Sequence, residues 1–240
     1  MGKRIIAQRR GRGSPTFRAH TFTRVAPARY PRIEGPLRRA EVAELVHDPG
    51  RGAPLAKIVV EDGTVFYNLA VEGLYVGEII YIGREGRVEN PPPGSILPLF
   101  AIPTGSLVCN VEKVPGDGGR YARASGAYAT LLAVVGDRAT LKLPSGKTIE
   151  VPACCLATIG VVAGGGRTAK PFMKAGNRWK LMRSRGRKYP IVKGVSMGAY
   201  AHPHGGGRHR RPGKPTTVSR HAPPGRKVGY IAAKKTGRGR

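Results

Sequence analysis

Positive charge is distributed unevenly along the 240-residue chain, and its distribution limits which segments can fold. Residues 1–39 contain eleven Lys/Arg and one acid, residues 40–166 contain ten Lys/Arg and thirteen acids, and residues 167–240 contain twenty-one Lys/Arg and no acid. Only the middle segment has nearly balanced charge. We therefore expect a folded middle segment with two basic ends, which repel themselves and stay disordered until a polyanion binds them.

Short apolar runs separated by turn signals predict an all-β body. Gly and Pro, with 35 and 21 residues, favour strands and loops over helices. Residues 40–90 are predicted to form a small barrel of the OB kind and residues 91–182 a second barrel, with the polyproline Asn90–Gly94 as a stiff linker. Residues 170–182 are predicted to form a short helix or an irregular turn that carries Trp179, since Gly176 weakens a helix. The predicted strands span residues 40–46, 56–60, 64–69 and 78–82 in the first barrel, and 107–114, 128–135, 139–143, 148–151 and 156–162 in the second.

Residues 1–39 are predicted to form an extended basic N-terminal arm. Arginines alternate with glycines from Arg9 to Arg18, and Phe17 and Phe22 offer rings on which bases can stack. Without a partner, such an arm is merely a solvated tail.

Residues 183–240 form the predicted basic C-terminal extension, whose most unusual stretch runs from Lys193 to Lys214. Here His202 and His204 precede three glycines and a basic cluster, in an irregular finger whose shape a partner completes. The histidines suit three roles: metal ligands, acid–base groups, or stacking and hydrogen-bonding groups against nucleic acid. No CxxC accompanies them, so contact with a polyanion is favoured.

A net charge of +28 requires a polyanionic partner. Nucleic acid is favoured because each neutralised phosphate releases counterions, whereas no run of 18 apolar residues and no amphipathic basic stripe indicates a membrane. The N-terminus shows no apolar signal-peptide region, and Cys109, Cys154 and Cys155 fit small core residues in a reducing compartment, so we expect a cytoplasmic protein. The low content of Asn and Gln hints at a thermophilic source.

No motif demands an enzyme. The run Gly146-Lys147-Thr148 resembles the end of a P-loop, but position 141 is Leu where the first glycine is needed. The run from Gly164 to Ala169 resembles a dinucleotide fingerprint, but no acid follows Glu150 to hold a ribose. The acids form no obvious cluster, so we predict no catalytic residue, no metal site, no cofactor and no small-molecule substrate.

Several motifs together resemble the archaeal form of the universal ribosomal protein L2 family (uL2), and the resemblance covers essentially the whole chain. The motifs are Gln8–Phe17, Lys174–Trp179, Gly194–Met197, His202-Pro-His-Gly-Gly-Gly207, Pro212–Arg220 and Pro224–Val228.

This resemblance implies an OB-fold barrel followed by an SH3-like barrel, with basic extensions threaded into ribosomal RNA. It implies a structural constituent of the large ribosomal subunit that binds 23S rRNA, contacts 16S rRNA at an intersubunit bridge and neighbouring large-subunit proteins, and supports subunit association, tRNA binding and the peptidyl transferase region. Mg²⁺ that accompanies the rRNA is compatible with this role. The residues that we expect to contact RNA are Arg9, Arg10, Arg12, Arg18, Arg178, Trp179, Arg183, His202, His204, Gly205, Gly206, Gly207, Arg208, Arg210 and Arg211.

In this family, proposals of a part in peptide-bond formation attach to the first histidine of His-Pro-His, here His202. The family usually has Asn-Pro-Val-Asp before this motif, whereas this chain has Gly198–Ala201, so no adjacent carboxylate can orient the ring. We therefore expect His202 to pack against RNA. Two alternatives stay open: a histidine-assisted acyl transfer and a non-specific, chromatin-type binder. The absence of a helix-turn-helix motif argues against the chromatin-type binder.

Overall fold

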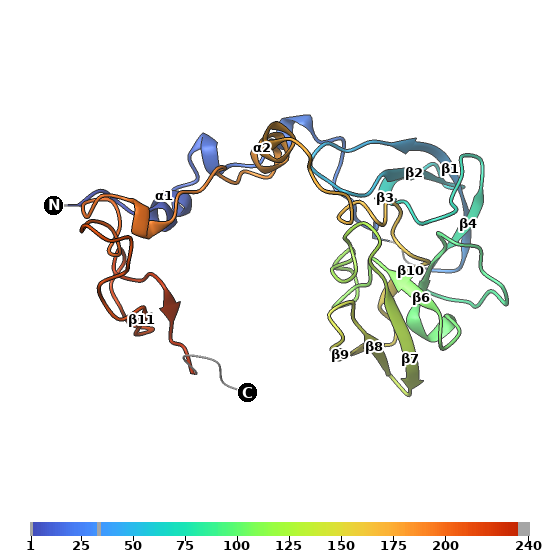
Figure 1. Ribbon diagram of the computed structural model, residues 1–240. Helices are drawn as coiled ribbons and strands as arrows, with labels where there is room; N and C mark the ends of the chain where they lie inside the picture. Colours follow the sequence, from blue (N-terminus) through green and yellow to red (C-terminus); the bar gives the residue numbers. More distant parts are fainter. Residues whose placement is uncertain (1, 33–34, 235–240) are drawn as a thin grey trace. The chain divides into compact units, whose positions relative to one another are not determined.

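The computed structural model describes residues 2–32 and 35–234, which fall into two compact units (Figure 1). The end unit lies within Met1–Thr21 and Phe172–Arg240, and the sheet unit is Phe22–Pro171. The two ends of the chain therefore pack on each other. The boundaries predicted at residues 39, 90 and 182 remain a prediction.

The sheet unit is built from strands, as the all-β prediction required. Ten strands form one hydrogen-bonded sheet in the order β3-β2-β1-β4-β5-β10-β6-β7-β8-β9. The strands are β1 (Arg38–Val46), β2 (Leu55–Val60), β3 (Val65–Leu69), β4 (Ile79–Ile82), β5 (Ile96–Pro98), β6 (Leu107–Cys109), β7 (Ala129–Val135), β8 (Arg138–Lys142), β9 (Thr148–Pro152) and β10 (Leu156–Ile159), with the 3₁₀ helix η3 (Leu99–Ala101) after β5.

Two predicted strands end earlier than expected, and the backbone explains both. The strand β6 ends at Cys109 because Asn110 has a φ of 47°, in the left-handed region that no strand continues through. The strand β10 ends at Ile159 because Gly160 has a φ of 113°. Strand β5 was not predicted, since its three residues follow the prolines of the linker and end on Pro98.

Two strands are shared between two hydrophobic cores. Successive side chains of a strand point to opposite faces, so Ile96 and Leu156 enter the core of β1–β4, whereas Leu97 and Ala157 enter the core of β6–β9. Strand β5 pairs with β4 through Ile82 and also with β10. The polyproline Asn90–Gly94 therefore joins two strands that pair directly, and its role as a stiff linker between two barrels stays a prediction.

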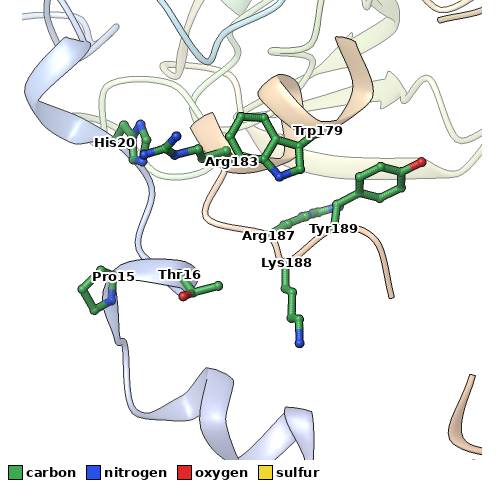
Figure 2. A pocket seen from close by; sticks show the side chains of 8 residues that line it. All are labelled: Pro15, Thr16, His20, Trp179, Arg183, Arg187, Lys188 and Tyr189. Carbon is green, nitrogen blue, oxygen red and sulfur yellow. The ribbon is translucent and has the colours of Figure 1, made fainter. Parts of the chain in front are cut away.

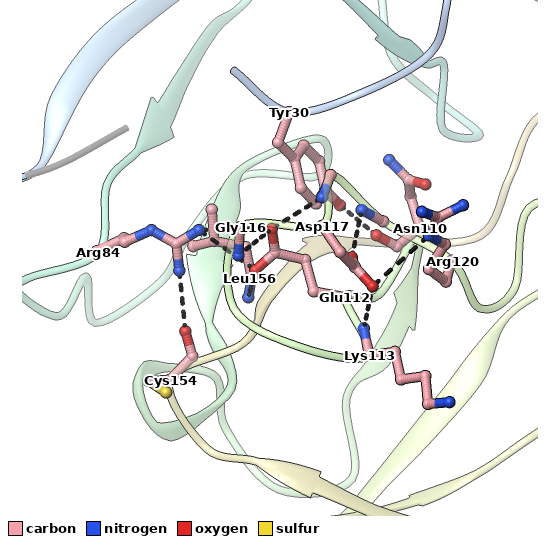
Figure 3. A network of polar contacts seen from close by, with 12 residues as sticks. Tyr30, Arg84, Asn110, Glu112, Lys113, Gly116, Asp117, Arg120, Cys154 and Leu156 are labelled. Carbon is pink, nitrogen blue, oxygen red and sulfur yellow. Dashed lines mark hydrogen bonds and ion pairs between the residues drawn. The ribbon is translucent and has the colours of Figure 1, made fainter. Parts of the chain in front are cut away.

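A buried hydrogen-bond network holds the two halves of the sheet unit in register (Figure 3). The Tyr30 hydroxyl donates to the Asn110 carbonyl oxygen at 2.7 Å and lies 2.6 Å from the Thr158 hydroxyl. The Asn68 amide donates to Thr158 at 2.9 Å and accepts from the Asn110 amide at 2.9 Å. Tyr30 is only 6% exposed, so this part of the predicted extended arm belongs to the folded core.

Glu112 is a second buried polar group of the sheet unit (Figure 3). Its carboxylate accepts backbone N–H groups of Gly116 at 3.1 Å, Gly118 at 3.2 Å and Leu156 at 2.9 Å, and it pairs with the Arg84 guanidinium at 3.3 Å. These donors replace the water that the carboxylate loses on burial.

The cysteines fit the core prediction in two of three cases. Cys109 and Cys155 are buried, and Cys154 is exposed. The alternation expected for adjacent strand residues does not apply, because Cys154 lies in the turn between β9 and β10, where the Cys155 N–H donates to the Pro152 carbonyl at 3.1 Å.

The end unit contains short elements with little buried surface. Helix α2 shows that the segment around Trp179, for which a short helix and an irregular turn were both open, is a helix, whereas the helix α1 was not predicted. No described helix is long and apolar enough to cross a membrane. The elements are α1 (Ile6–Gly11), η1 (Pro15–Phe17), α2 (Ala175–Ser184), η4 (Gly194–Ser196), β11 (Thr217–Val218) and β12 (Tyr230–Ile231), and η2 (Thr21–Thr23) lies at the border between the units.

Candidate nucleic-acid interface

Helix α2 ends in a hydrogen-bond arrangement that turns the chain sharply. Gly186 adopts a left-handed φ of 63°, and its N–H donates to the Arg183 carbonyl at 3.0 Å. The next N–H, of Arg187, donates to the Met182 carbonyl at 2.8 Å. This pair of bonds is a Schellman motif, in which glycine at the left-handed position avoids a clash of Cβ with the backbone.

Gly186 also admits the N-terminal segment against the end of α2. A Cβ at this position would lie 2.6 Å from the Ala19 nitrogen and 2.9 Å from the Phe17 carbonyl oxygen. The backbone N–H of His20 donates to the Ser184 carbonyl at 3.3 Å. The absence of a side chain at residue 186 therefore allows the two ends of the chain to meet.

The meeting point encloses a pocket of about 430 Å³, which we name the α2 pocket (Figure 2). The Arg183 guanidinium lies 5.2 Å from the centre of the Trp179 ring, and Arg178 lies 5.2 Å from the Tyr189 ring, both within the range of cation–π attraction. In the view of Figure 2, Arg183 lies between His20 and the indole. The lining residues are Pro15, Thr16, His20, Trp179, Arg183, Arg187, Lys188 and Tyr189.

Sequence reasoning identified two lining residues, Trp179 and Arg183, and missed the others. Arg187 and Lys188 beside Tyr189 are a basic–aromatic cluster that the sequence does show. No pattern could link His20 to this cluster, because only the tertiary contact at Gly186 joins them.

The first arginines of the predicted site lie on and just after α1. The helix begins where the Gln8 side-chain oxygen accepts the backbone N–H of Ile5 at 3.0 Å. Two arginines lie in its last turn, at the negative end of the helix dipole, where positive charge is favourable. The exposed arginines of this segment are Arg9, Arg10, Arg12 and Arg18.

The predicted histidine finger is a loop closed by its own hydrogen bonds. The Gly206 N–H donates to the Met197 carbonyl at 2.9 Å, and the Gly205 N–H donates to the His202 carbonyl at 2.9 Å. The N-terminal segment joins the loop through Lys3, whose N–H donates to the Tyr200 carbonyl at 2.6 Å. The expectation that a partner must complete its shape is therefore wrong for the backbone of this loop.

The two histidines of this loop interact with each other. The His202 Nδ1 accepts the backbone N–H of His204 at 3.0 Å, and the two rings lie edge to face with centroids 5.1 Å apart. Burial, together with the charge of His204, lowers the pKa of His202 from its usual value, which favours the neutral ring. The His202 ring packs directly on Gly194, where a Cβ would overlap it.

The glycines and arginines after the histidines have different roles. Gly205 lies against the backbone of Met197 and Gly198, and Gly206, with a φ of 82°, lies against Ala199. Gly207 also has a φ of 82°, but nothing crowds it. The exposed cations that follow are Arg208, Arg210 and Arg211.

The end unit concentrates the positive charge of the protein. Its sequence ranges contain twenty-five Lys/Arg and no Asp or Glu, whereas the sheet unit contains seventeen Lys/Arg and fourteen acids. Among residues 2–32 and 35–234, no group of three His, Cys, Asp or Glu side chains could hold a metal ion. The arrangement can therefore bind an extended polyanion and stack planar groups.

Comparisons with known proteins indicate the same family for both halves of the chain. Residues 3–82 match the family model "Ribosomal Proteins L2, RNA binding N-terminal domain", and residues 92–226 match "Ribosomal Proteins L2, C-terminal domain". Similar proteins named "Large ribosomal subunit protein uL2" occur in Korarchaeum cryptofilum (53% identity, 99% of this chain and 96% of the relative), Hyperthermus butylicus (54%, 99% and 99%) and Natronomonas pharaonis (52%, 100% and 98%). The chain therefore belongs to the ribosomal protein L2 (uL2) family.

Proposed function

We propose that the protein is a structural constituent of the large ribosomal subunit that binds ribosomal RNA, in the cytoplasm. The observation that carries the proposal is an end unit with twenty-five cations and no acid, in which α2 presents aromatic and basic side chains together. A surface of this kind leaves its charge uncompensated unless it meets a polyanion. The names of the relatives and the RNA-binding family model support RNA as this polyanion.

The finer part of the proposal concerns fold and partners. The core of β1–β4 corresponds to the OB-fold barrel and the core of β6–β9 to the SH3-like barrel, which dock on folded 23S rRNA by shape. The end unit neutralises phosphates and reaches 16S rRNA at an intersubunit bridge and neighbouring large-subunit proteins. Arginine suits this task because its planar guanidinium makes bidentate phosphate contacts and also stacks on bases.

The histidine loop fits RNA packing better than catalysis. One ring nitrogen of His202 already accepts a backbone N–H, and the described structure orients the ring by Gly194 and His204 rather than by a carboxylate. His202 and His204 then act as packing residues in the RNA-bound loop, and no catalytic role is assigned to them.

The test is the salt dependence of binding. The purified full-length protein is titrated with large-subunit rRNA fragments and with matched duplex DNA, and the logarithm of affinity is plotted against the logarithm of salt concentration. Each phosphate contact contributes a slope of roughly 0.7 to 0.9. A preference for rRNA that persists at high salt supports the proposal. Equal affinities for rRNA and DNA that collapse together would reduce the protein to a non-specific polycation.

A further inference from the structure

We propose that the α2 pocket holds one unstacked RNA nucleotide, with its base against the Trp179 indole and its phosphate beside Arg187 and Lys188. The inference rests on the proposed function and deepens it, because it assigns a single-nucleotide site to one place in the end unit. It goes beyond general attraction between cations and phosphates, since it requires a base.

The size and walls of the pocket fit one nucleotide. Pockets for small ligands span about 300 to 1,000 Å³, and the α2 pocket, at about 430 Å³, lies near the lower end. Trp179 is 43% exposed, so much of the indole is available for a further contact. The walls contributed by Pro15 and Thr16 come from the N-terminal segment.

The ring contacts favour a planar ligand. The Arg183 guanidinium already lies 5.2 Å from the centre of the Trp179 ring, so a planar cation and an aromatic ring stand next to each other where a base can contact them. Tyr189 lines the same pocket and is itself fixed by Arg178 at 5.2 Å. Unpaired bases in protein–RNA complexes are held on aromatic rings and arginine planes of this type.

The charge of the pocket selects an anion. Arg183, Arg187 and Lys188 line it, and the end unit has no acid to neutralise them. A neutral aromatic ligand would leave three cations uncompensated. A nucleotide within an RNA strand supplies both a planar base and phosphates on its two sides. The pocket forms only where the two ends of the chain meet at Gly186, so it is a folded site rather than a tail.

Trp179 is the sole tryptophan of the chain, so its fluorescence reports directly on this pocket. The full-length protein is titrated with an RNA octamer of uridines and with an octamer of the same length and charge that lacks all bases. The uridine octamer is expected to quench Trp179 emission, because a base stacks on the indole, whereas the abasic octamer binds without quenching.

Affinities of labelled octamers for variants give the second readout. Trp179→Ala is expected to weaken uridine-octamer binding by about 5- to 100-fold and to leave abasic-octamer binding unchanged, because stacking on an aromatic residue contributes on that order per base. Trp179→Phe retains a ring and should keep most of the affinity, which separates loss of stacking from loss of folding. Arg187→Gln should weaken binding more than Lys180→Gln, a matched loss of charge on α2 outside the pocket lining.

Equal affinity for both octamers, with no quenching at saturation, overturns the nucleotide site. Quenching by an acidic, tyrosine-containing peptide as strong as that by the uridine octamer also overturns it and assigns the pocket to a protein partner. Neither result affects the salt-dependent preference for rRNA, so failure of this inference is distinguishable from failure of the proposed function.

Discussion

Glu112 offers the sharpest test of how the sheet unit is held together. Its carboxylate is 0% exposed and receives three backbone N–H groups and the Arg84 guanidinium. One oxygen accepts from Gly116 and Gly118, the other accepts from Leu156, and the Arg84 guanidinium reaches both oxygens, at 3.4 and 3.3 Å. We therefore choose Glu112→Gln, which keeps the shape of the side chain and removes its charge.

The magnitude follows from the donors that the amide cannot accept. In one orientation of the new amide, its NH₂ group faces the N–H groups of Gly116 and Gly118, and in the other it faces the N–H of Leu156, so at least one buried donor is left unpaired. A hydrogen bond to a charged group contributes about 1.5 to 3 kcal/mol, and breaking a buried ion pair costs about 3 to 5 kcal/mol. Arg84 has some access to water, which offsets part of this loss. We expect Glu112→Gln to reduce the free energy of unfolding by about 3 to 5 kcal/mol, a large share of the roughly 5 to 15 kcal/mol typical of a domain.

The assay must report on the sheet unit alone. The sole tryptophan lies in the end unit, so its emission is unsuitable. Urea unfolding should instead be followed by labelling of the buried Cys109 and Cys155 thiols, because every cysteine of the chain lies in the sheet unit. Glu150→Gln is the matched control, because the same change at an exposed acid should stay within about 0.5 kcal/mol. A loss below about 1 kcal/mol for Glu112→Gln would refute the reasoning that its four donors depend on the charge.

Three further predictions concern other parts of the molecule. Burial raises the pKa of the Cys109 and Cys155 thiols to about 12, so iodoacetamide at about pH 8 should modify only the exposed third cysteine until the protein unfolds, as counted by mass spectrometry. Burial and the neighbouring histidine lower the pKa of His202, so its NMR titration midpoint should lie below about 6.5. As the pH falls below about 6.5, the unfolded chain takes up this proton more readily than the folded loop, so the loop loses stability. Gly186→Ala adds left-handed strain of roughly 1 to 2 kcal/mol and a clash, and should expose the N-terminal segment to protease, whereas Gly213→Ala, with a similar φ of 62° and open space, should do so far less.

The strands of the sheet unit could be predicted because local signals determine them. Alternating burial in β1, where Ala40 and Val42 face the core between exposed Arg39 and Glu41, is visible directly in the residue types. The turns also carry their own signals, such as Gly63, which has a φ of 81°.

The predictions failed for features that depend on contacts between residues far apart in the sequence. Strand β5 is buried on both faces because Ile96 and Leu97 serve different cores, and no alternation exists in such a strand to reveal it. In the sequence, Tyr30 lies in the segment predicted to be a basic arm. In the structure, its hydroxyl contacts Asn110 and Thr158. The α2 pocket likewise exists only because residues near both ends of the chain converge, so the sequence suggested its aromatic and basic side chains but not their assembly.

The two units differ in how their positive charge is neutralised. The sheet unit has ion pairs of its own, Arg38–Asp62, Arg51–Asp48, Arg84–Glu112 and Arg120–Asp117, so part of its basic charge is neutralised internally. The end unit has no acid with which to pair, so its cations must find their counter-charge outside the chain. The salt-dependent part of RNA binding therefore arises mainly from the end unit, because each released counterion reports a cation that was unpaired before binding. Whatever preference for rRNA remains at high salt then measures shape recognition by the sheet unit together with stacking in the α2 pocket.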